Sequence, residues 1–299
     1  MKSLTHLVRR NCKLFFKDKG MFFSACITPF IMLVLYGTFL ANVYRDSFAS
    51  SLPDFFQIPE NLIDATVGGQ LVSSLLAVCS VTVAFCCNML MIQDKTTGAK
   101  KDLTVAPVKK STLALSYYLA AAFSTLLVCL TAAGACLLYL AKVGWYLTAA
   151  DVVLILLDVF LLVMFGTALS SVVHFFLSTQ GQMSAVGTIV SAGYGFICGG
   201  YMPIAQFGDG LQKVLSFFPG TYGTCLIRNH VLRGVFAEMK AVGFPADVVE
   251  GIRDSIDCNL YFFGTQVKIS QMYLVFGCSI AALVGIYVLQ NICLRKKSR

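Results

Sequence analysis

Long runs of apolar residues, separated by short polar segments, dominate the pattern along this chain. Six of them contain no Lys, Arg or Glu and are long enough to cross a hydrocarbon core of roughly 30 Å, which takes about 20 helical residues. They are Met21–Val43, Thr66–Ile92, Leu113–Leu140, Ala149–Phe176, Met183–Gly200 and Ile269–Cys293. Of the 299 residues, 57% are hydrophobic and 13% are charged, whereas a soluble domain averages about a quarter charged. The pattern therefore predicts an all-α integral membrane protein with six transmembrane helices.

Residues 1–20 show a different pattern, in which apolar and basic residues repeat with a helical period. At 100° per residue, one face carries Leu4, Leu7, Val8, Cys12, Leu14 and Phe15, and the opposite face carries Lys2, Arg9, Arg10, Lys13 and Lys17. A helix of this kind lies in the headgroup layer of an anionic membrane surface. We therefore expect residues 1–20 to form a cytoplasmic amphipathic interface helix, followed by the six-span domain at 21–299.

The basic residues predict an orientation. Segments 2–19, 93–110 and 295–299 carry six, five and four Lys and Arg residues, whereas the two short loops on the other side carry only Arg45 and Lys142. Loops rich in Lys and Arg stay in the cytoplasm, and long loops are left out of this comparison because they translocate regardless of charge. Both ends of the chain are therefore expected in the cytoplasm.

The longest segment between spans, Tyr201–Lys268, contains apolar stretches too short to cross a membrane. Asp209 can N-cap a first short helix that Pro219 stops, and Thr221 can cap a second helix that runs to Gly234. Two short apolar helices separated by a break are typical of a re-entrant pair. We expect the pair to dip into the outer leaflet between spans five and six.

The remainder of this segment, 235–268, is expected to form a small external cap, so that 201–268 holds the re-entrant helices and the cap. Pro245 and the capping box after it predict one short helix in the cap. Most of the 12 Cys residues lie inside apolar runs, where Cys behaves as a small hydrophobe, and no CxxC pair or Cys/His cluster has metal-ligand spacing. Only Cys225 and Cys258 face outside together, and both a disulfide and two free thiols remain open for them.

Two spans contain unusual residues. Asp158 lies deep in the fourth span, where a carboxylate costs roughly 2.5–3.5 kcal/mol, so it is either a pathway group or a hydrogen-bond partner of a neighbouring helix. Asp151 is expected at the interface. The fifth span has small residues at every fourth position, which let another helix approach closely, in a second subunit or in the same chain. They are Gly187, Ser191, Gly195 and Gly199.

Motifs for chemistry are absent from the sequence. There is no GxxxxGK[ST], so the chain itself has no P-loop for ATP. The three His residues are scattered, and no catalytic set converges on shared spacing. We expect no catalytic residues, no metal and no cofactor in this chain, so the chain has no energy source of its own.

The loop between the second and third spans, Gln93–Lys110, reads QDKTTGAKKDLTVAPVKK. Five of its eighteen residues are Lys, its middle predicts one or two turns of helix, and Pro107 stiffens its exit. It either caps two membrane helices or docks a partner. Asp102 and Leu103 favour docking, because a requirement for positive charge explains only the lysines.

The order of these features resembles the membrane (permease) subunit of type-2 ATP-binding-cassette exporters. The resemblance covers nearly the whole chain and rests on the loop Thr97-Gly98…Leu103…Ala106-Pro107-Val108 and on Gly199-Gly200-Tyr-Met-Pro203…Phe-Phe-Pro219. One departure is Gly208-Asp209-Gly210, where relatives often have a second Pro. The external insert is nearer to the drug- and antibiotic-exporting members than to compact glycan exporters.

The resemblance implies roles for particular residues. Coupling to a separate ATPase, which binds ATP and Mg, would involve the first cytoplasmic loop through Thr97, Gly98, Lys100, Lys101, Asp102, Leu103 and Pro107. Pathway candidates are Ser73, Ser74, Thr82, Asp158, Ser191 and Tyr194. Outer-gate candidates are Pro203, Phe217, Phe218 and Pro219. Independently of the resemblance, the spacing of small residues in the fifth span makes Gly187, Gly195 and Gly199 the subunit-interface candidates.

The expected working unit contains two permeases, identical or paralogous, and two ATPases in the cell membrane, with the pathway between the permeases. The leading hypothesis is ATP-driven export of an amphipathic drug-like, lipid or peptide substrate, as in multidrug efflux. Export of a lipid-linked glycan is one alternative. A non-transporting membrane scaffold or immunity protein is the other.

Overall fold

The computed structural model describes residues 2–36, 38, 41–42, 45, 59–105 and 108–293. Its longer helices are α1 (Lys2–Lys17), α2 (Lys19–Leu35), α4 (Glu60–Cys87), α7 (Lys110–Val143), α8 (Ala149–Phe176), α9 (Gln180–Ile197), α11 (Pro219–Ala241) and α13 (Ile269–Cys293). The shorter elements are α5 (Leu90–Thr96), α6 (Ala99–Val105), the 3-10 turn η2 (Ile204–Gln206), α10 (Asp209–Leu215), α12 (Ala246–Ser255) and a hairpin of β1 (Tyr261–Phe262) and β2 (Thr265–Gln266). The predicted all-α fold is confirmed.

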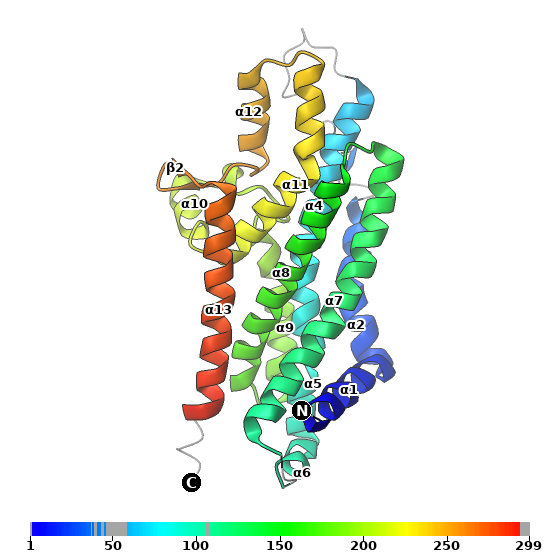
Figure 1. Ribbon diagram of the computed structural model, residues 1–299, viewed down its shortest axis with the longest axis vertical. Coiled ribbons are helices and arrows are strands. Elements are labelled where there is room, and N and C mark those ends of the chain that lie inside the picture. The colour runs from blue at the N-terminus through cyan, green and yellow to red at the C-terminus, as the bar shows by residue number, and fades with distance from the viewer. Residues whose placement is uncertain are drawn as a thin grey trace.

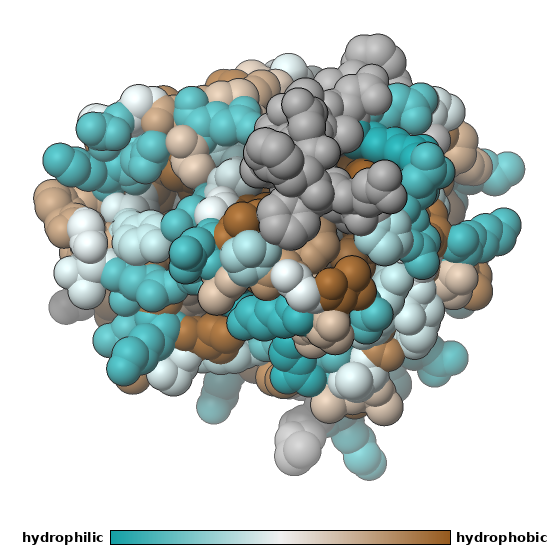
Figure 2. All heavy atoms as spheres, turned by 90° about the horizontal axis from the view of Figure 1, so that it is seen from above, coloured by the Kyte–Doolittle hydropathy of each residue, from teal (hydrophilic) through white to brown (hydrophobic). Residues whose placement is uncertain are grey.

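The helices form an elongated bundle with two distinct ends (Figure 1). One end, called the lower end, carries α1, α5, α6 and the last turns of α13, and the upper end carries α12 and the end of α11. Seen from above, the described surface of the upper end is largely hydrophilic with scattered apolar residues (Figure 2). Such a surface is suited to water outside the membrane.

Helix α4 lies at the centre of the bundle and packs against α2, α7, α8, α9 and α11. Its most apolar window is 94% buried inside the chain, compared with 17% for that of α13. A Cβ added at Gly166 of α8 would lie 2.9 Å from the Cα of Val81, so this glycine lets the two helix backbones approach closely. Gly166 thus allows α8 to pack closely against the buried helix α4.

Four helical stretches are long and apolar enough to cross a membrane: Glu60–Thr96, Lys110–Val143, Ala149–Phe176 and Ile269–Asn291. The pair α1 and α2 meets the same criterion only together, and its two helices are bent by 74°. Helix α9 is 18 residues long and is not among the four. The multi-pass character is clear, but the count of six remains a prediction, and the end of the first predicted span lies partly outside the described residues.

Helix α1 forms where the amphipathic pattern predicts it. Phe15 is buried, and Leu4, Leu7, Val8 and Cys12 are half-buried. Two positions differ from the simple wheel, since Leu14 is exposed and Arg10 is half-buried. Asp18 then caps α2 by accepting a hydrogen bond from the backbone N–H of Met21 at 3.1 Å.

The segment between α9 and α13 differs from its prediction in the length of its second helix. Gly208 is the N-cap of α10 in place of Asp209, which begins the helix, and α11 starts at Pro219 and continues past Gly234 to Ala241. A Cβ at Gly234 would collide with the carbonyl of Tyr146, so this glycine serves a close packing contact and does not end the helix. The predicted re-entrant shape is therefore not established.

The cap contains the predicted short helix, α12, but not its capping box. Pro245 stands at the N-cap without a side-chain bond, while Val249 and Ile252 are buried. Cys225 and Cys258 are free thiols, and the Cys225 thiol donates a hydrogen bond to the Cys258 carbonyl at 3.3 Å. This settles the alternative between a disulfide and two thiols in favour of the thiols.

Candidate functional site

At the lower end, α5 and α6 form a helical hairpin that depends on Gly98. The φ angle of Gly98 is +85°, in the left-handed region that strains residues with a Cβ. The Thr97 hydroxyl donates a hydrogen bond to the carbonyl of Gln93 at 2.9 Å and stabilises the last turn of α5. The Thr-Gly pair thus forms the turn, and α6 is the predicted short helix after it.

Helix α6 presents some residues to solvent and others to the bundle. Lys101, Asp102 and Val105 are exposed, with 87% of Val105 accessible. Leu103 is half-buried and packs against the apolar cluster of Leu90, Met91, Leu113 and Tyr117. Leu103 therefore anchors α6 to the bundle, and Val105 is the apolar side chain left available to a partner. Pro107 lies outside the described residues.

A buried carboxylate joins three helices at the base of this hairpin. Asp94 of α5 accepts two hydrogen bonds from the Arg10 guanidinium, at 2.7 and 3.2 Å, and one from the Tyr117 hydroxyl at 2.5 Å. Asp94 is only 4% exposed, so these charge-assisted bonds are sheltered from water. They connect α1, α5 and α7.

A lysine connects the same hairpin to a fourth helix. The Lys95 ammonium donates hydrogen bonds to the carbonyls of His174, Phe175 and Leu177, at 3.1, 3.0 and 2.7 Å. These carbonyls lie at the C-terminal end of α8, where the helix dipole favours a cation, and the His174 carbonyl also accepts the backbone N–H of the C-cap residue Leu177. Displacement of α5 would therefore be transmitted to α8.

Near the upper end, Arg228 of α11 is the centre of a second polar cluster. It is 1% exposed and donates to the carbonyls of Ile256 and Gly199, at 2.7 and 2.9 Å, and to the Ser74 hydroxyl at 3.1 Å. It also lies 3.4 Å from the carboxylate of Asp257. The cluster holds together α4, α11, the end of α9 and the end of α12.

Asp257 extends this cluster to η2. Its carboxylate accepts the backbone N–H groups of Ile204 and Ala205, at 2.5 and 2.9 Å. Burial raises the pKa of Asp257 above its ordinary value, and the positive charge of Arg228 offsets part of that rise. The ionised carboxylate thus depends on its arginine.

Asp158 belongs to a third polar cluster, inside the bundle. Its carboxylate lies 2.6 Å from Nδ1 of His230 and accepts a hydrogen bond from the Tyr273 hydroxyl at 2.6 Å. The three side chains come from α8, α11 and α13, so the carboxylate is satisfied by neighbouring helices. Asp151, expected at the interface, is buried at the start of α8, caps that helix together with Thr148 and lies 2.6 Å from Arg233.

A groove of about 720 Å³ runs between α2 and α9. Its walls are mainly apolar, with Ser and Thr hydroxyls among them, and they include Gly187 and Ser191. Gly195 and Gly199 have contacts within the chain, because a Cβ at Gly195 would collide with the ring of Tyr201, and Gly199 lies at φ +71° beside Asp257. Of the three predicted interface glycines, Gly187 is the one on the groove.

A comparison with protein families identifies this arrangement. Residues 50–289, most of the chain, match the family described as ABC-2 family transporter protein. The chain belongs to this family. A search of curated proteins finds no relative of significant similarity. The ABC-2 permease domain is a membrane component of its transporter and is not itself the ATPase, and membership implies an ATPase partner in the complex.

In this ABC-2 permease, the predicted pathway residues occupy two environments. Ser191 lines the groove, whereas Ser73, Ser74, Thr82 and Tyr194 are buried. Ser73 and Thr82 donate to carbonyls of their own helix, and Ser74 accepts from Arg228. Their role in a pathway stays a prediction.

The predicted gate residues of the permease lie on either side of α10. Pro203 is buried before η2, and Pro219 is the first residue of α11. Phe217 and Phe218 are exposed, and the Phe217 ring packs edge-on against two aromatic rings of the β1–β2 hairpin. The position of these residues at the upper end is compatible with a gate but does not test it.

Sequence reasoning missed the residues that hold the permease together. Arg228, His230 and Asp257 received no role, although an Arg and a His on a predicted apolar helix were a usable signal. Arg10 and Asp94 were read only as interface and loop residues. Their partners lie far away in sequence, so spacing alone could not pair them.

Proposed function

We propose that this ABC-2 permease is the transmembrane subunit of an ATP-driven exporter and that a separate ATPase subunit docks on α6. The observation that carries the proposal is the contrast between the two sides of the hairpin. Its tip presents Lys101, Asp102 and Val105 to solvent, while Asp94 and Lys95 at its base are bonded to α1, α7 and α8. An exposed tip on a fixed base is suited to transmit movement of the ATPase to the bundle.

In this proposal the lower end faces the cytoplasm, and α2 and α9 complete six spans in the cell membrane. The positive-inside rule supports the orientation, because α1 and the α5–α6 hairpin share that end and both are rich in Lys and Arg. Helix α10 and the start of α11 would then lie in the outer leaflet.

A second permease, identical or paralogous, would cover the groove between α2 and α9 and form the pathway with it. Exposed apolar side chains on α2 and α9, among them Phe30 and Ile189 beside the groove residues, support burial against another chain. A volume of about 720 Å³ falls within the roughly 300–1,000 Å³ typical of drug-sized ligand sites. The mixture of apolar walls and hydroxyl groups suits an amphipathic drug-like, lipid or peptide substrate.

Photo-cross-linking at Val105 tests the docking site directly. With p-benzoylphenylalanine at this position in cells, we expect an adduct that contains a P-loop ATPase. The matched control is Val242, which is also exposed but lies at the opposite end of the bundle. The absence of an ATPase from the Val105 adduct, or an equal yield at Val242, would refute the docking site.

A charge at the same position tests the function. Val105→Asp places a carboxylate in the proposed interface, and loss of one interface hot spot costs about 2 kcal/mol or more, or roughly 30-fold in affinity. We expect substrate-stimulated ATPase activity and export to fall together in proteoliposomes while insertion is unchanged. Val242→Asp should leave both activities intact.

A further inference from the structure

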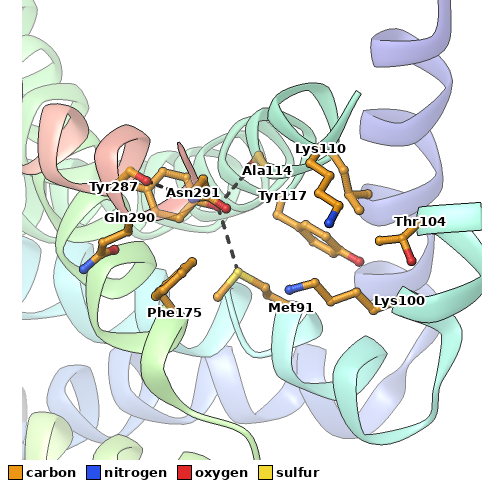
Figure 3. Close-up of a pocket in the computed structure, with 11 residues that line it drawn as sticks. Met91, Lys100, Thr104, Lys110, Ala114, Tyr117, Phe175, Tyr287, Gln290 and Asn291 are labelled. Atoms are coloured by element: carbon orange, nitrogen blue, oxygen red, sulfur yellow. Dashed lines mark hydrogen bonds between the residues drawn. The ribbon is translucent and has the colours of Figure 1, made fainter. Parts of the chain in front are cut away.

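A cavity of about 210 Å³ lies behind α6 at the lower end (Figure 3). Its walls come from α5, α6, the start of α7, the last turn of α8 and the end of α13. It is separate from the α2–α9 groove and shares no lining residue with it. The proposed export function assigns it no role.

Two lysines point into this cavity from different helices. Lys100 of α6 and Lys110, the first residue of α7, extend their ammonium groups toward the same space (Figure 3). Neither makes an ion pair with any residue that the structure describes. Burial, and then the charge of Lys110, lower the pKa of Lys100. The nearby Asp94 is already bonded to Arg10 and Tyr117, so it cannot neutralise two lysines.

The rest of the wall is partly apolar and partly polar. Met91, Phe175 and the ring of Tyr287 form the apolar part. The side-chain oxygen of Gln290 is buried and has no hydrogen-bond partner within the described part of the chain. A ligand that carries negative charge for the two lysines, a hydroxyl that donates to the Gln290 oxygen and some apolar surface would satisfy all these groups.

The size of the cavity selects among such ligands. At about 210 Å³ it is below the roughly 300–1,000 Å³ of drug-sized sites, so it does not fit the proposed cargo. It has room for one phosphate with a small substituent. Helix α13, which forms one wall, is the least covered of the four long apolar helices, so lipid can reach this side of the bundle. Anionic lipids are concentrated on the cytoplasmic surface, where each Lys gains about 1 kcal/mol from them.

We propose that this cavity binds the phosphate of an anionic ligand between Lys100 and Lys110, and that the headgroup of an acidic phospholipid supplies it. The lipid source rests on the cytoplasmic orientation in the proposed function, but the binding chemistry does not depend on an ATPase. A bound headgroup would tie α6 to α7 and α13. The proposed docking helix would then be held in place by the membrane it works in.

Native mass spectrometry of the purified chain, titrated with dioleoylphosphatidylglycerol, tests this proposal. Each neutralised lysine should weaken binding about 5-fold, so Lys100→Gln with Lys110→Gln should weaken it roughly 30-fold. The matched control is Lys101→Gln with Lys109→Gln, which removes the same charge from exposed neighbours that do not line the cavity. Lys110→Gln alone, at the exposed start of α7, should weaken binding about 5-fold even if the double variant misfolds.

Parallel titrations distinguish the sources of the phosphate. We expect dioleoylphosphatidylcholine to bind more weakly than dioleoylphosphatidylglycerol, and only the binding of dioleoylphosphatidylglycerol to depend on the two lysines. This result would support an acidic lipid headgroup as the source of the phosphate. A second outcome is that inorganic phosphate binds and depends on both lysines, whereas the lipid does not bind. That result would support the phosphate site and overturn the lipid as its source. Equal binding of the lipid by both double variants would overturn the site. Cross-linking at Val105 is unaffected by any of these results, so the two proposals fail separately.

Discussion

Replacing Arg228 with Met tests whether the upper polar cluster holds the bundle together. Methionine keeps much of the length of the side chain but removes the charge and all its donors. Asp257 would then remain buried without its cation, and the carbonyls of Ile256 and Gly199 would lose a donor each. Loss of one partner from a buried ion pair typically costs about 3–5 kcal/mol. For a chain of this size, about 2–4 °C per kcal/mol predicts a fall in Tm of roughly 10 °C.

A second substitution separates the charge from the packing. Asp257→Asn in the Arg228→Met background removes the unpaired charge but keeps an oxygen that can accept a backbone N–H from η2. We expect this double variant to recover about 1–3 kcal/mol relative to Arg228→Met, in the range of measured couplings between contacting residues. Lys240→Met, on the exposed side of the same helix, is the matched control and should leave the Tm unchanged.

The same variants should differ in their dependence on pH. Burial raises the pKa of Asp257 in the folded state, and without Arg228 that pKa should rise further. An acid with a raised folded pKa stabilises the fold below its unfolded pKa, and this stability is lost as the pH rises through the folded pKa. The loss of stability caused by Arg228→Met should therefore be largest near neutral pH and become smaller as the pH falls toward 3.8, the ordinary pKa of Asp.

Thermal unfolding of the detergent-purified chain, followed by fluorescence-detected size exclusion across the pH series, measures these effects. An Arg228→Met deficit that does not change with pH, or that Asp257→Asn fails to reduce, would refute the assignment of the cost to an unpaired carboxylate. A Tm within about 2 °C of the unmodified chain would refute the structural role of the cluster.

Two further predictions concern the core and the lower end. Gly166→Ala should cost about 1–3 kcal/mol because its Cβ would press on the backbone of Val81, whereas Gly134→Ala, with open space around it, should cost nothing. Equal melting of the two glycine variants would contradict the close α4–α8 contact. Asp94→Ala removes the charge-assisted bonds that hold α1, about 1.5–3 kcal/mol for such a bond, so hydrogen exchange in α1 should accelerate. Unchanged protection of α1 would show that its apolar face alone holds it.

The helices and the lower hairpin could be predicted because their signals are local. The amphipathic period predicts α1, and the pattern of Gln93–Lys110 predicts one or two turns of helix in the middle of the loop, where α6 forms. The same local reasoning misread Gly234 as a helix end, because its reason lies in the carbonyl of Tyr146, on another element. The sequence alone does not distinguish a glycine that ends a helix from one that allows close packing inside a helix.

The polar clusters could not be predicted because each joins residues distant along the chain. Asp158 and His230 are 72 residues apart, and Ser74 and Arg228 are 154 apart. The sequence left open whether Asp158 is a pathway group or a hydrogen-bond partner of a neighbouring helix. In the structure it has hydrogen-bond partners on two helices, α11 and α13. The sequence also could not predict which apolar residue of α6 is exposed. Leu103 and Val105 are both apolar, but Leu103 packs on the bundle and Val105 is exposed.

The burial of α4 has a consequence for how this protein is made. In the finished bundle α4 is almost fully covered by other helices, yet the most apolar window of the stretch Glu60–Thr96 has a mean hydropathy of 2.3, close to the 2.2 of the poorly covered α13. Chains are synthesised from the N-terminus, so α4 leaves the ribosome before α7, α8, α9 and α11 exist to surround it. Its apolar side chains make it stable in the bilayer as a single helix, and its small residues then allow the later helices to pack closely against it. One sequence thus satisfies two successive environments, lipid during biogenesis and protein afterwards.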